Sequence, residues 1–205
     1  MKKIVFATIP MQEINPQHYI SEENKAIEYN EKIRFPINSV LANTLKKGDD
    51  VTVVLIVTEG EFSEENVEHY KVELDQINST IGANITYDRV DSPFKETSDI
   101  VELRFRQLIE KVKENSTIYA DMTYGPKTLT PVIFFALSFA EKFFNADISH
   151  IVYGRIIHGG NKQAIPDTAA LFDVTPLYYL NSLTSVMEAK DSKTALARLD
   201  KFFAM

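Results

Sequence analysis

Cysteine is absent from this chain of 205 residues. Disulfide bonds and thiolate metal sites are therefore excluded, and so is the usual cysteine-bearing zinc centre of a nucleobase deaminase. The absence is typical of a reducing compartment, so we expect a cytoplasmic protein. The remaining residue types show no metal-binding constellation, and we expect neither a metal nor a cofactor.

Long apolar runs are missing as well. The most apolar segment, PVIFFALSFA at 131–140, has about half of the roughly twenty residues that a membrane-spanning helix needs. The first residues show no apolar core followed by a small-residue cleavage site, so nothing indicates secretion. We therefore expect no membrane segment in this chain and interpret 131–140 as part of a core helix.

Positive charge is scarce. The chain has 22 Lys and Arg residues against 29 Asp and Glu residues, which gives a net charge of −7. A negative chain is poorly suited to coat DNA or RNA, so we expect no DNA binding, although a local site for a small anionic ligand is compatible with this charge. The glycine-rich dinucleotide fingerprint and the Walker phosphate loop are also absent, which disfavours NAD and ATP as ligands.

Apolar periodicity predicts strands that alternate with helices. The patterns indicate strands at 2–10, 51–60, 83–90, 117–122, 147–156 and 169–177, and helices at 35–50, 63–82, 97–116, 131–144 and 178–205. This alternation predicts a Rossmann-like, doubly wound α/β domain. Its mostly parallel sheet would have helices on both faces and would end in a C-terminal hairpin and helix. We expect a domain at 1–176 and a terminal helix at 177–205, with 11–35 as a long loop.

Ligands of such sheets bind beyond the carboxyl ends of the strands. The turns at these ends are ATIPMQ (7–12), VTEGEF (57–62), DMTYGPKT (121–128) and VYGRIIHGG (152–160). In two of them a glycine stands within two residues of a cation, Gly125 with Lys127 and Gly154 with Arg155. A glycine turn, a helix start and a cation together favour phosphate. The alternative is purely structural, with Thr130 as helix cap and Pro131 as the first helical residue.

The segment YADMTYGPKTLTPVIFFALSFAEKFFNADISHIVYG, residues 119–154, resembles the signature of the CRISPR-associated Rossmann-fold sensor domains called CARF. In that family a strand ends in Asp-x-Thr-x-Gly, followed by a basic residue, an apolar helix, and a strand that ends near Tyr-Gly. FDVTPLYYL, residues 172–180, is similar to the stretch that closes these domains. The resemblance follows the order of elements over the whole chain and the residues from about 117 to 180.

The resemblance implies a homodimer that binds a cyclic oligoadenylate, usually the tetra- or hexa-adenylate, on its two-fold axis. Such a sensor acts in type III CRISPR antiviral signalling and regulates an effector, which here would be a C-terminal module absent from this chain or an associated protein. Carried over by position or placed at the same edge, the ligand-binding residues are Thr8, Ile9, Pro10, Met11, Gln12, Thr58, Glu59, Thr123, Tyr124, Gly125, Pro126, Lys127, Thr128, Gly154 and Arg155. The loop from Met11 onward would close over the ring.

Two positions depart from the family pattern. Tyr124 stands where a histidine is common, so histidine chemistry at that position is in doubt. Lys127 replaces a common arginine, which keeps the positive charge but loses bidentate geometry. The Arg155–His158 spacing does not match that of the ribonuclease modules attached to such sensors.

Two other functions stay open. Some CARF domains are metal-independent ring nucleases that cut their own ligand, leaving a 2′,3′-cyclic phosphate, and Thr8, Thr123 and Lys127 would then be the catalytic residues. The third hypothesis is a nucleotide-responsive regulatory domain outside CRISPR. The apolar helix is a separate question, because its six large apolar side chains surround much of the helix. Either the helix is enclosed within the domain or one side meets a second subunit, and we expect the subunit contact. The six side chains are Phe134, Phe135, Leu137, Phe139, Phe143 and Phe144.

Overall fold

The computed structural model describes residues 2–160, 165 and 167–203. Its strands are β1 (Lys2–Ile9), β2 (Asp50–Thr58), β3 (Asn84–Ser92), β4 (Thr117–Asp121), β5 (Asp147–Arg155) and β6 (Ala170–Asp173). Its helices are η1 (Lys25–Ile27), α1 (Pro36–Thr44), α2 (Ser63–Ile81), α3 (Ser98–Glu110), α4 (Leu129–Phe144), α5 (Thr175–Val186) and α6 (Ser192–Phe203). The chain divides into two compact units, residues 1–175 and 176–205.

The six strands form one sheet in the order β3-β2-β1-β4-β5-β6. All neighbouring pairs are parallel except β5 with β6, which is antiparallel. β1 and β2 are buried along nearly their whole length, as expected of apolar, β-branched strands covered on both faces. The predicted Rossmann-like fold with a terminal antiparallel pairing is therefore confirmed.

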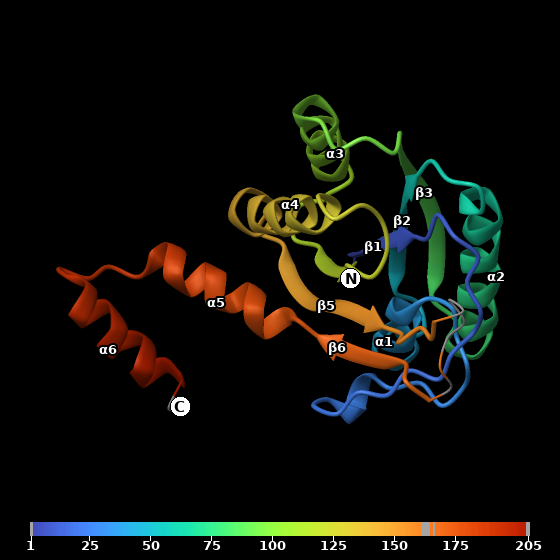
Figure 1. Ribbon diagram of the computed structural model, residues 1–205, viewed down its shortest axis with the longest axis horizontal. Coiled ribbons are helices and arrows are strands. Elements are labelled where there is room, and N and C mark those ends of the chain that lie inside the picture. The colour runs from blue at the N-terminus through green and yellow to red at the C-terminus, as the bar shows by residue number, and fades with distance from the viewer. Residues whose placement is uncertain (1, 161–164, 166, 204–205) are drawn as a thin grey trace. The chain divides into compact units, whose positions relative to one another are not determined.

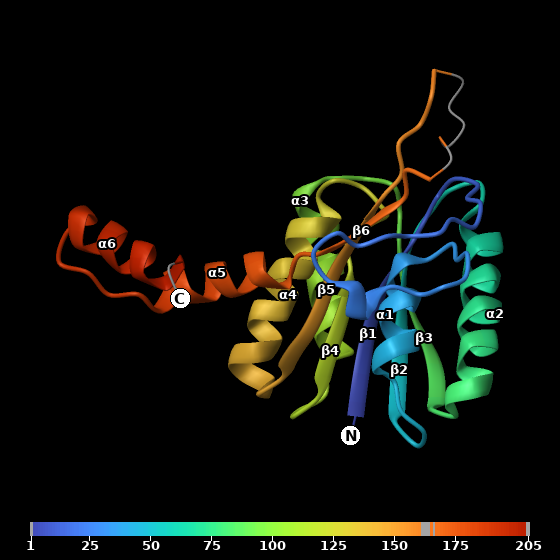
Figure 2. The ribbon, with the colours of Figure 1, turned by 90° about the horizontal axis from the view of Figure 1, so that it is seen from below.

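The helices cover both faces of this sheet. α1 and α2 lie on one face, and α3 and α4 lie on the other (Figure 1). This arrangement follows from right-handed crossovers: the chain moves outward from β1 to β3 and then returns to β4 on the other side. The direction of strand addition therefore reverses between β1 and β4. Figure 2 shows the carboxyl ends of the parallel strands, with their connecting loops, at the end of the sheet opposite the N-terminus.

The long loop 11–35 is packed against the core. Tyr19, Ile27 and Ile33 are buried within the cluster that also contains α1 and α2 side chains. An antiparallel bridge between Gln17 and Ile33 closes the loop on itself, and a bridge from Ile20 to Ala170 ties it to β6. The loop contains no helix beyond the short η1 turn.

The C-terminal prediction was wrong in two respects. β6 ends at Asp173, and Thr175 and Pro176, which we expected in the strand, begin α5. Proline suits the first turn of a helix, where its missing N–H costs no internal bond. The helix expected to continue to the end is interrupted after Val186, and α6 begins anew where the Asp191 side chain accepts a hydrogen bond from the N–H of Thr194 at 2.7 Å.

Candidate functional site

The centre of the candidate site is the buried carboxylate of Asp121, the last residue of β4. It accepts hydrogen bonds from the hydroxyl of Thr8 on β1 and from both the hydroxyl and the N–H of Thr123. The Thr8 hydroxyl oxygen in turn accepts the N–H of Tyr124 at 3.1 Å, and the Thr123 hydroxyl oxygen accepts the N–H of Gly154 at 2.9 Å. One carboxylate thus joins the ends of β1, β4 and β5 at the point where the strand order reverses.

Burial raises the pKa of Asp121 to about 6, against the lowering effect of the hydrogen bonds from Thr123 and Thr8. Among the residues that the structure describes, no lysine, arginine or histidine forms an ion pair with this carboxylate, which lies in the interior next to a turn. Strongly perturbed carboxyl groups at strand ends are typical of functional sites. Here the group shapes the turn from the inside, because its exposed fraction is 1% and a ligand at the surface does not reach it.

The turn between β4 and α4 presents Gly125 and Lys127 to the solvent. Gly125 has φ +101°, and a Cβ at this position would lie 2.7 Å from the Leu129 side chain. Only glycine therefore fits both the backbone conformation and the close approach. Pro126 is buried, and its carbonyl accepts the N–H of Leu129 at 2.9 Å, which tightens the entry into α4.

α4 begins two residues earlier than expected. Thr128 is its N-cap, without a side-chain capping bond, so Pro131 is the third helical residue and Thr130 does not cap the helix. The capping role passes instead to Glu96, whose carboxylate accepts the N–H of Thr128 at 3.1 Å. This hydrogen bond lowers the pKa of Glu96. A carboxylate therefore satisfies a helix-start N–H beside Lys127.

The side chain of Tyr124 points into the protein. Its hydroxyl donates to the carbonyl of Arg34 at 2.8 Å, and its ring packs edge-on against Phe35 at 6.4 Å between centroids. Burial raises the pKa of Tyr124 well above the usual value. The phenol of Tyr124 therefore connects the turn to the end of loop 11–35. Only the backbone of Tyr124, and not its side chain, faces the candidate site.

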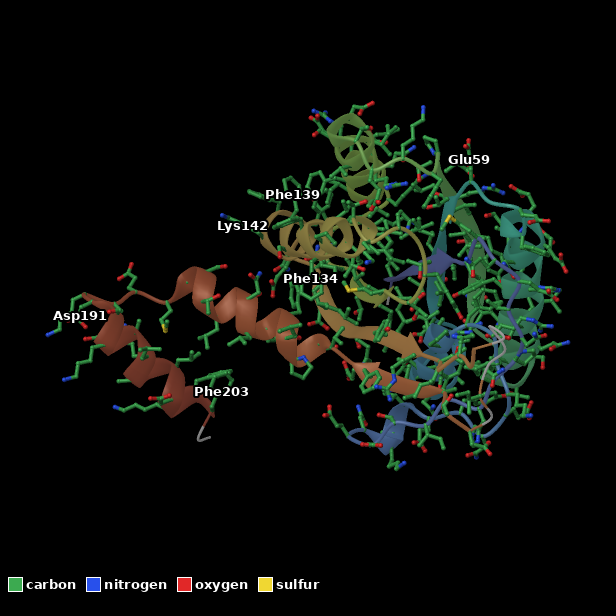
Figure 3. All side chains as sticks on the ribbon, in the orientation of Figure 1. Glu59, Phe134, Phe139, Lys142, Asp191 and Phe203 are labelled. Atoms are coloured by element: carbon green, nitrogen blue, oxygen red, sulfur yellow. The ribbon has the colours of Figure 1, made fainter. Side chains whose placement is uncertain are left out.

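The residues after β1 and β2 form a second part of the same edge. Ile9, Pro10 and Thr58 are buried, Met11 is half-buried, and Gln12 and Glu59 are exposed; Figure 3 labels Glu59. The amide of Asn66 on α2 donates to the carbonyls of both Pro10 and Gln12 at 2.9 Å. The start of the loop is thereby attached to α2, whereas Thr8 belongs to the Asp121 network.

The end of β5 adds an arginine. Gly154 is buried, and a Cβ there would lie 2.3 Å from Pro36 of α1 and 3.1 Å from Tyr19 of loop 11–35, so the strand end needs glycine to pass these two residues. The guanidinium of Arg155 is exposed and lies 5.1 Å from the centroid of the Phe172 ring. Lys127 and Arg155 are thus the exposed cations among the expected ligand-binding residues.

Sequence reasoning overlooked Glu96, Asp173 and Thr175. Asp173 accepts hydrogen bonds from the N–H and hydroxyl of Thr175, as Asp121 does from Thr123. This signal was visible, because Asp-x-Thr occurs both in ADMTYG and in FDVTPL. The link from Glu96 to α4 was not visible, because the two residues are 32 positions apart.

A separate apolar groove of about 670 Å³ lies between α3 and α4. Phe105 and Phe139 meet edge-on across it at 5.8 Å between centroids, and Phe135 and Phe143 expose 67% and 60% of their surface. Phe139 and Lys142 of α4, both labelled in Figure 3, belong to the residues that line the groove. The groove also reaches Glu96, the residue that caps α4. Large exposed aromatic patches on a globular domain are typical of protein contacts.

Among residues 2–160, 165 and 167–203, no group of three or more His, Cys, Asp or Glu side chains is placed to hold a metal ion. Within the part of the chain that the structure describes, no helix combines the length and the apolar character needed to cross a membrane. No protein-family model matches this chain, and no curated protein sequence matches it.

Proposed function

We propose that this protein is a dimeric sensor that binds a cyclic oligoadenylate at the carboxyl edge of its sheet. The observation that carries the proposal is the turn 122–128. It stands at the reversal of strand order, is shaped by buried Asp121, and presents Gly125 and Lys127 outward. Ligands of doubly wound sheets bind at such a reversal point.

The chemistry of this edge suits a phosphodiester. Lys127 and Arg155 supply charge-assisted hydrogen bonds, and Gly125 allows a bulky anion to approach the backbone closely. The net charge of −7 of the whole chain favours a compact ligand with few phosphates over a long polyanion. A tetra- or hexa-adenylate ring meets that description, and its bases can contact the half-buried apolar side chain of Met11.

Binding without cleavage is the favoured mode. Ring cleavage by Thr8 and Thr123 would need their hydroxyls at the ligand, but both are engaged in hydrogen bonds with Asp121, and Thr8 is 1% exposed. Of the three residues considered for a ring nuclease, Lys127 alone is exposed, whereas Thr8 is buried and Thr123 half-buried. A single lysine can hold a phosphate but does not place a 2′-hydroxyl in line with it.

The proposed dimer would use the groove between α3 and α4. The exposed aromatic residues Phe135 and Phe143 are the natural contact, and an acidic residue at one end, Glu96, and a basic one at the other, Lys142, favour a two-fold arrangement that pairs opposite charges. The sensor would then respond by differential binding, with the ring favouring one arrangement of the dimer over another.

Incubation of the purified chain with cyclic tri-, tetra- and hexa-adenylate, followed by chromatography of the recovered ligand, tests the mode of action. We expect one ring to be retained by the protein and recovered intact. Linear products bearing a 2′,3′-cyclic phosphate, formed by the wild type and lost in Lys127→Ala, would establish a ring nuclease instead. Retention of a mononucleotide but of none of the rings would favour a regulatory domain outside CRISPR signalling.

A further inference from the structure

Asp-x-Thr occurs at 50–52, within β2, and at the ends of β4 and β6, and the two strand-end copies have the same hydrogen-bond pattern. At the end of β4, Oδ1 of Asp121 accepts the N–H of Thr123 at 3.1 Å together with its hydroxyl. At the end of β6, Oδ1 of Asp173 accepts the N–H of Thr175 at 3.1 Å and its hydroxyl at 2.5 Å. The two segments therefore share their hydrogen bonds as well as their Asp-x-Thr sequence.

Both turns attach to β5, which lies between β4 and β6 in the sheet. The hydroxyl oxygen of Thr123 accepts the N–H of Gly154 at 2.9 Å, and that of Thr175 accepts the N–H of Ile151 at 2.8 Å. The two aspartates stand on either side of a single β5 residue, since Val152 pairs with Asp121 in one ladder and with Asp173 in the other. Backbone bonds from Met122 to Val152 and from Val174 to Ile151, each 2.8 Å long, reinforce the two attachments.

The remaining oxygen of each carboxylate has a different partner. Oδ2 of Asp121 accepts the hydroxyl of Thr8 and so extends the connection to β1. Oδ2 of Asp173 lies 3.1 Å from Nδ1 of His150, a residue of β5 itself. Hydrogen bonds thus connect β1 through Asp121 and Thr123 to Gly154 of β5, and the backbone of β5 leads to Ile151, which is hydrogen-bonded to Thr175, the first residue of α5.

We infer that Asp173 and Thr175 are positioning residues for the ligand edge, and that β5 couples ligand binding at this edge to the start of α5. This inference rests on the proposed function. An anion held at the turn 122–128 would shift Thr123, and the shift would reach Gly154 through a direct hydrogen bond. Because Ile151 and Gly154 belong to one strand, the displacement would continue to Thr175 and the first turn of α5. A contiguous hydrogen-bonded element of this kind can carry coupling between sites.

The first arm of the test measures amide hydrogen exchange in the full-length protein with and without cyclic tetra- and hexa-adenylate. We expect ring binding to slow exchange at 175–179 by about fivefold or more, a typical size for coupling between sites. Thr175→Val should abolish this change and weaken ring binding by the same factor, because coupling is reciprocal. Thr175→Ser, which keeps the hydroxyl, should restore both.

The matched control is Thr44→Val. The Thr44 hydroxyl is hydrogen-bonded as well, since it donates to the carbonyl of Val40 at 2.8 Å, but it lies at the opposite edge of the sheet. This variant should keep the ring-induced change at 175–179. Tight ring binding with no change in exchange at α5, or a change that persists in Thr175→Val, would overturn the inference while leaving the proposed function intact.

A second arm needs no ligand, so it tests the coupling through β5 separately from the proposed binding of a cyclic oligoadenylate. Thr123→Val removes one attachment of β5, and it should accelerate exchange of the Ile151 and Thr175 amides more than Thr44→Val does. Thr123→Ser should resemble the wild type. If no ring binds, the proposed function fails, and this arm still decides the coupling: unchanged exchange at Thr175 in Thr123→Val would contradict it.

Discussion

At the scale of single residues, the identity of Asp121 is the most informative feature. A fully buried carboxylate destabilises the fold wherever it is ionised, unless its hydrogen bonds replace all of its hydration. Its three donors, two threonine hydroxyls and one N–H, leave the pKa at about 6 and thus replace that hydration only in part. The hydrogen bonds of Asp121 shape the turn, and its burial lowers the stability of the fold.

The pH dependence of stability should show this directly. The pKa of Asp121 rises from 3.8 to about 6 on folding, so its stabilising contribution is present at about pH 4 and is lost as the pH rises through 6. A displacement of that size corresponds to roughly 3 kcal/mol of unfolding free energy. Because other groups titrate as well, the quantity to measure is the difference in denaturant-unfolding free energy between wild type and Asp121→Asn from pH 4 to 7. A difference that does not change across this range would contradict the assignment.

Gly125 can be tested against a matched glycine. In Gly125→Ala the alanine has an unfavourable positive φ and a Cβ too close to the Leu129 side chain. In Gly48→Ala it has only an unfavourable φ of +80°, with nothing within 4 Å of the new Cβ. We expect unfolding free energies lower by about 1 kcal/mol for Gly48→Ala and by roughly 2–3 kcal/mol for Gly125→Ala. Equal losses in chemical denaturation would show that the contact with Leu129 is not rigid.

At the scale of elements, periodicity predicted where most strands and helices lie, because the two kinds of element differ in apolar spacing and in length. The short, continuously apolar β2 and the longer α4 are examples. Periodicity misplaced the boundary between β6 and α5 and missed the break between α5 and α6. FDVTPL resembles a strand in its apolar content, but the Asp173 carboxylate takes the N–H of Thr175 and starts a helix there. The start of α4 depends on Glu96, which is 32 positions away from Thr128 in the sequence. Side chains that supply a cap from a distance leave no local pattern in the sequence.

At the scale of the whole molecule, strand order was not predictable, since periodicity does not say which strands are neighbours. That order places β1 beside β4 and so brings Thr8 to Asp121 across 113 positions of sequence. The candidate residues of the turn were predictable from Asp-x-Thr-x-Gly and the following lysine. The inward direction of the Tyr124 side chain was not, because it depends on the packing of loop 11–35.

The proposed dimer makes a prediction at this scale. Phe135→Asp places a charge on the exposed side of α4, so it should raise the dimer dissociation constant by about tenfold or more and leave the melting temperature nearly unchanged. Val72→Asp is the control, because Val72 is 55% exposed on α2, on the other face of the sheet. Sedimentation velocity over a range of concentrations distinguishes the two variants. A monomeric wild type would contradict the proposed dimer. A Phe135→Asp dimer with the same dissociation constant as the wild type would show that the groove is not the dimer interface.

The most direct test of the central claim is calorimetric titration of the wild type, Lys127→Ala and Lys47→Ala with cyclic tetra- and hexa-adenylate. Lys47 is an exposed lysine at the amino edge of the sheet and serves as the control. We expect one ring to bind per dimer, with affinity at least about tenfold weaker in Lys127→Ala because a charge-assisted bond to phosphate is lost, and unchanged in Lys47→Ala. No heat of binding with either ring, or equal affinities for all three proteins, would contradict a ligand site at the turn 122–128.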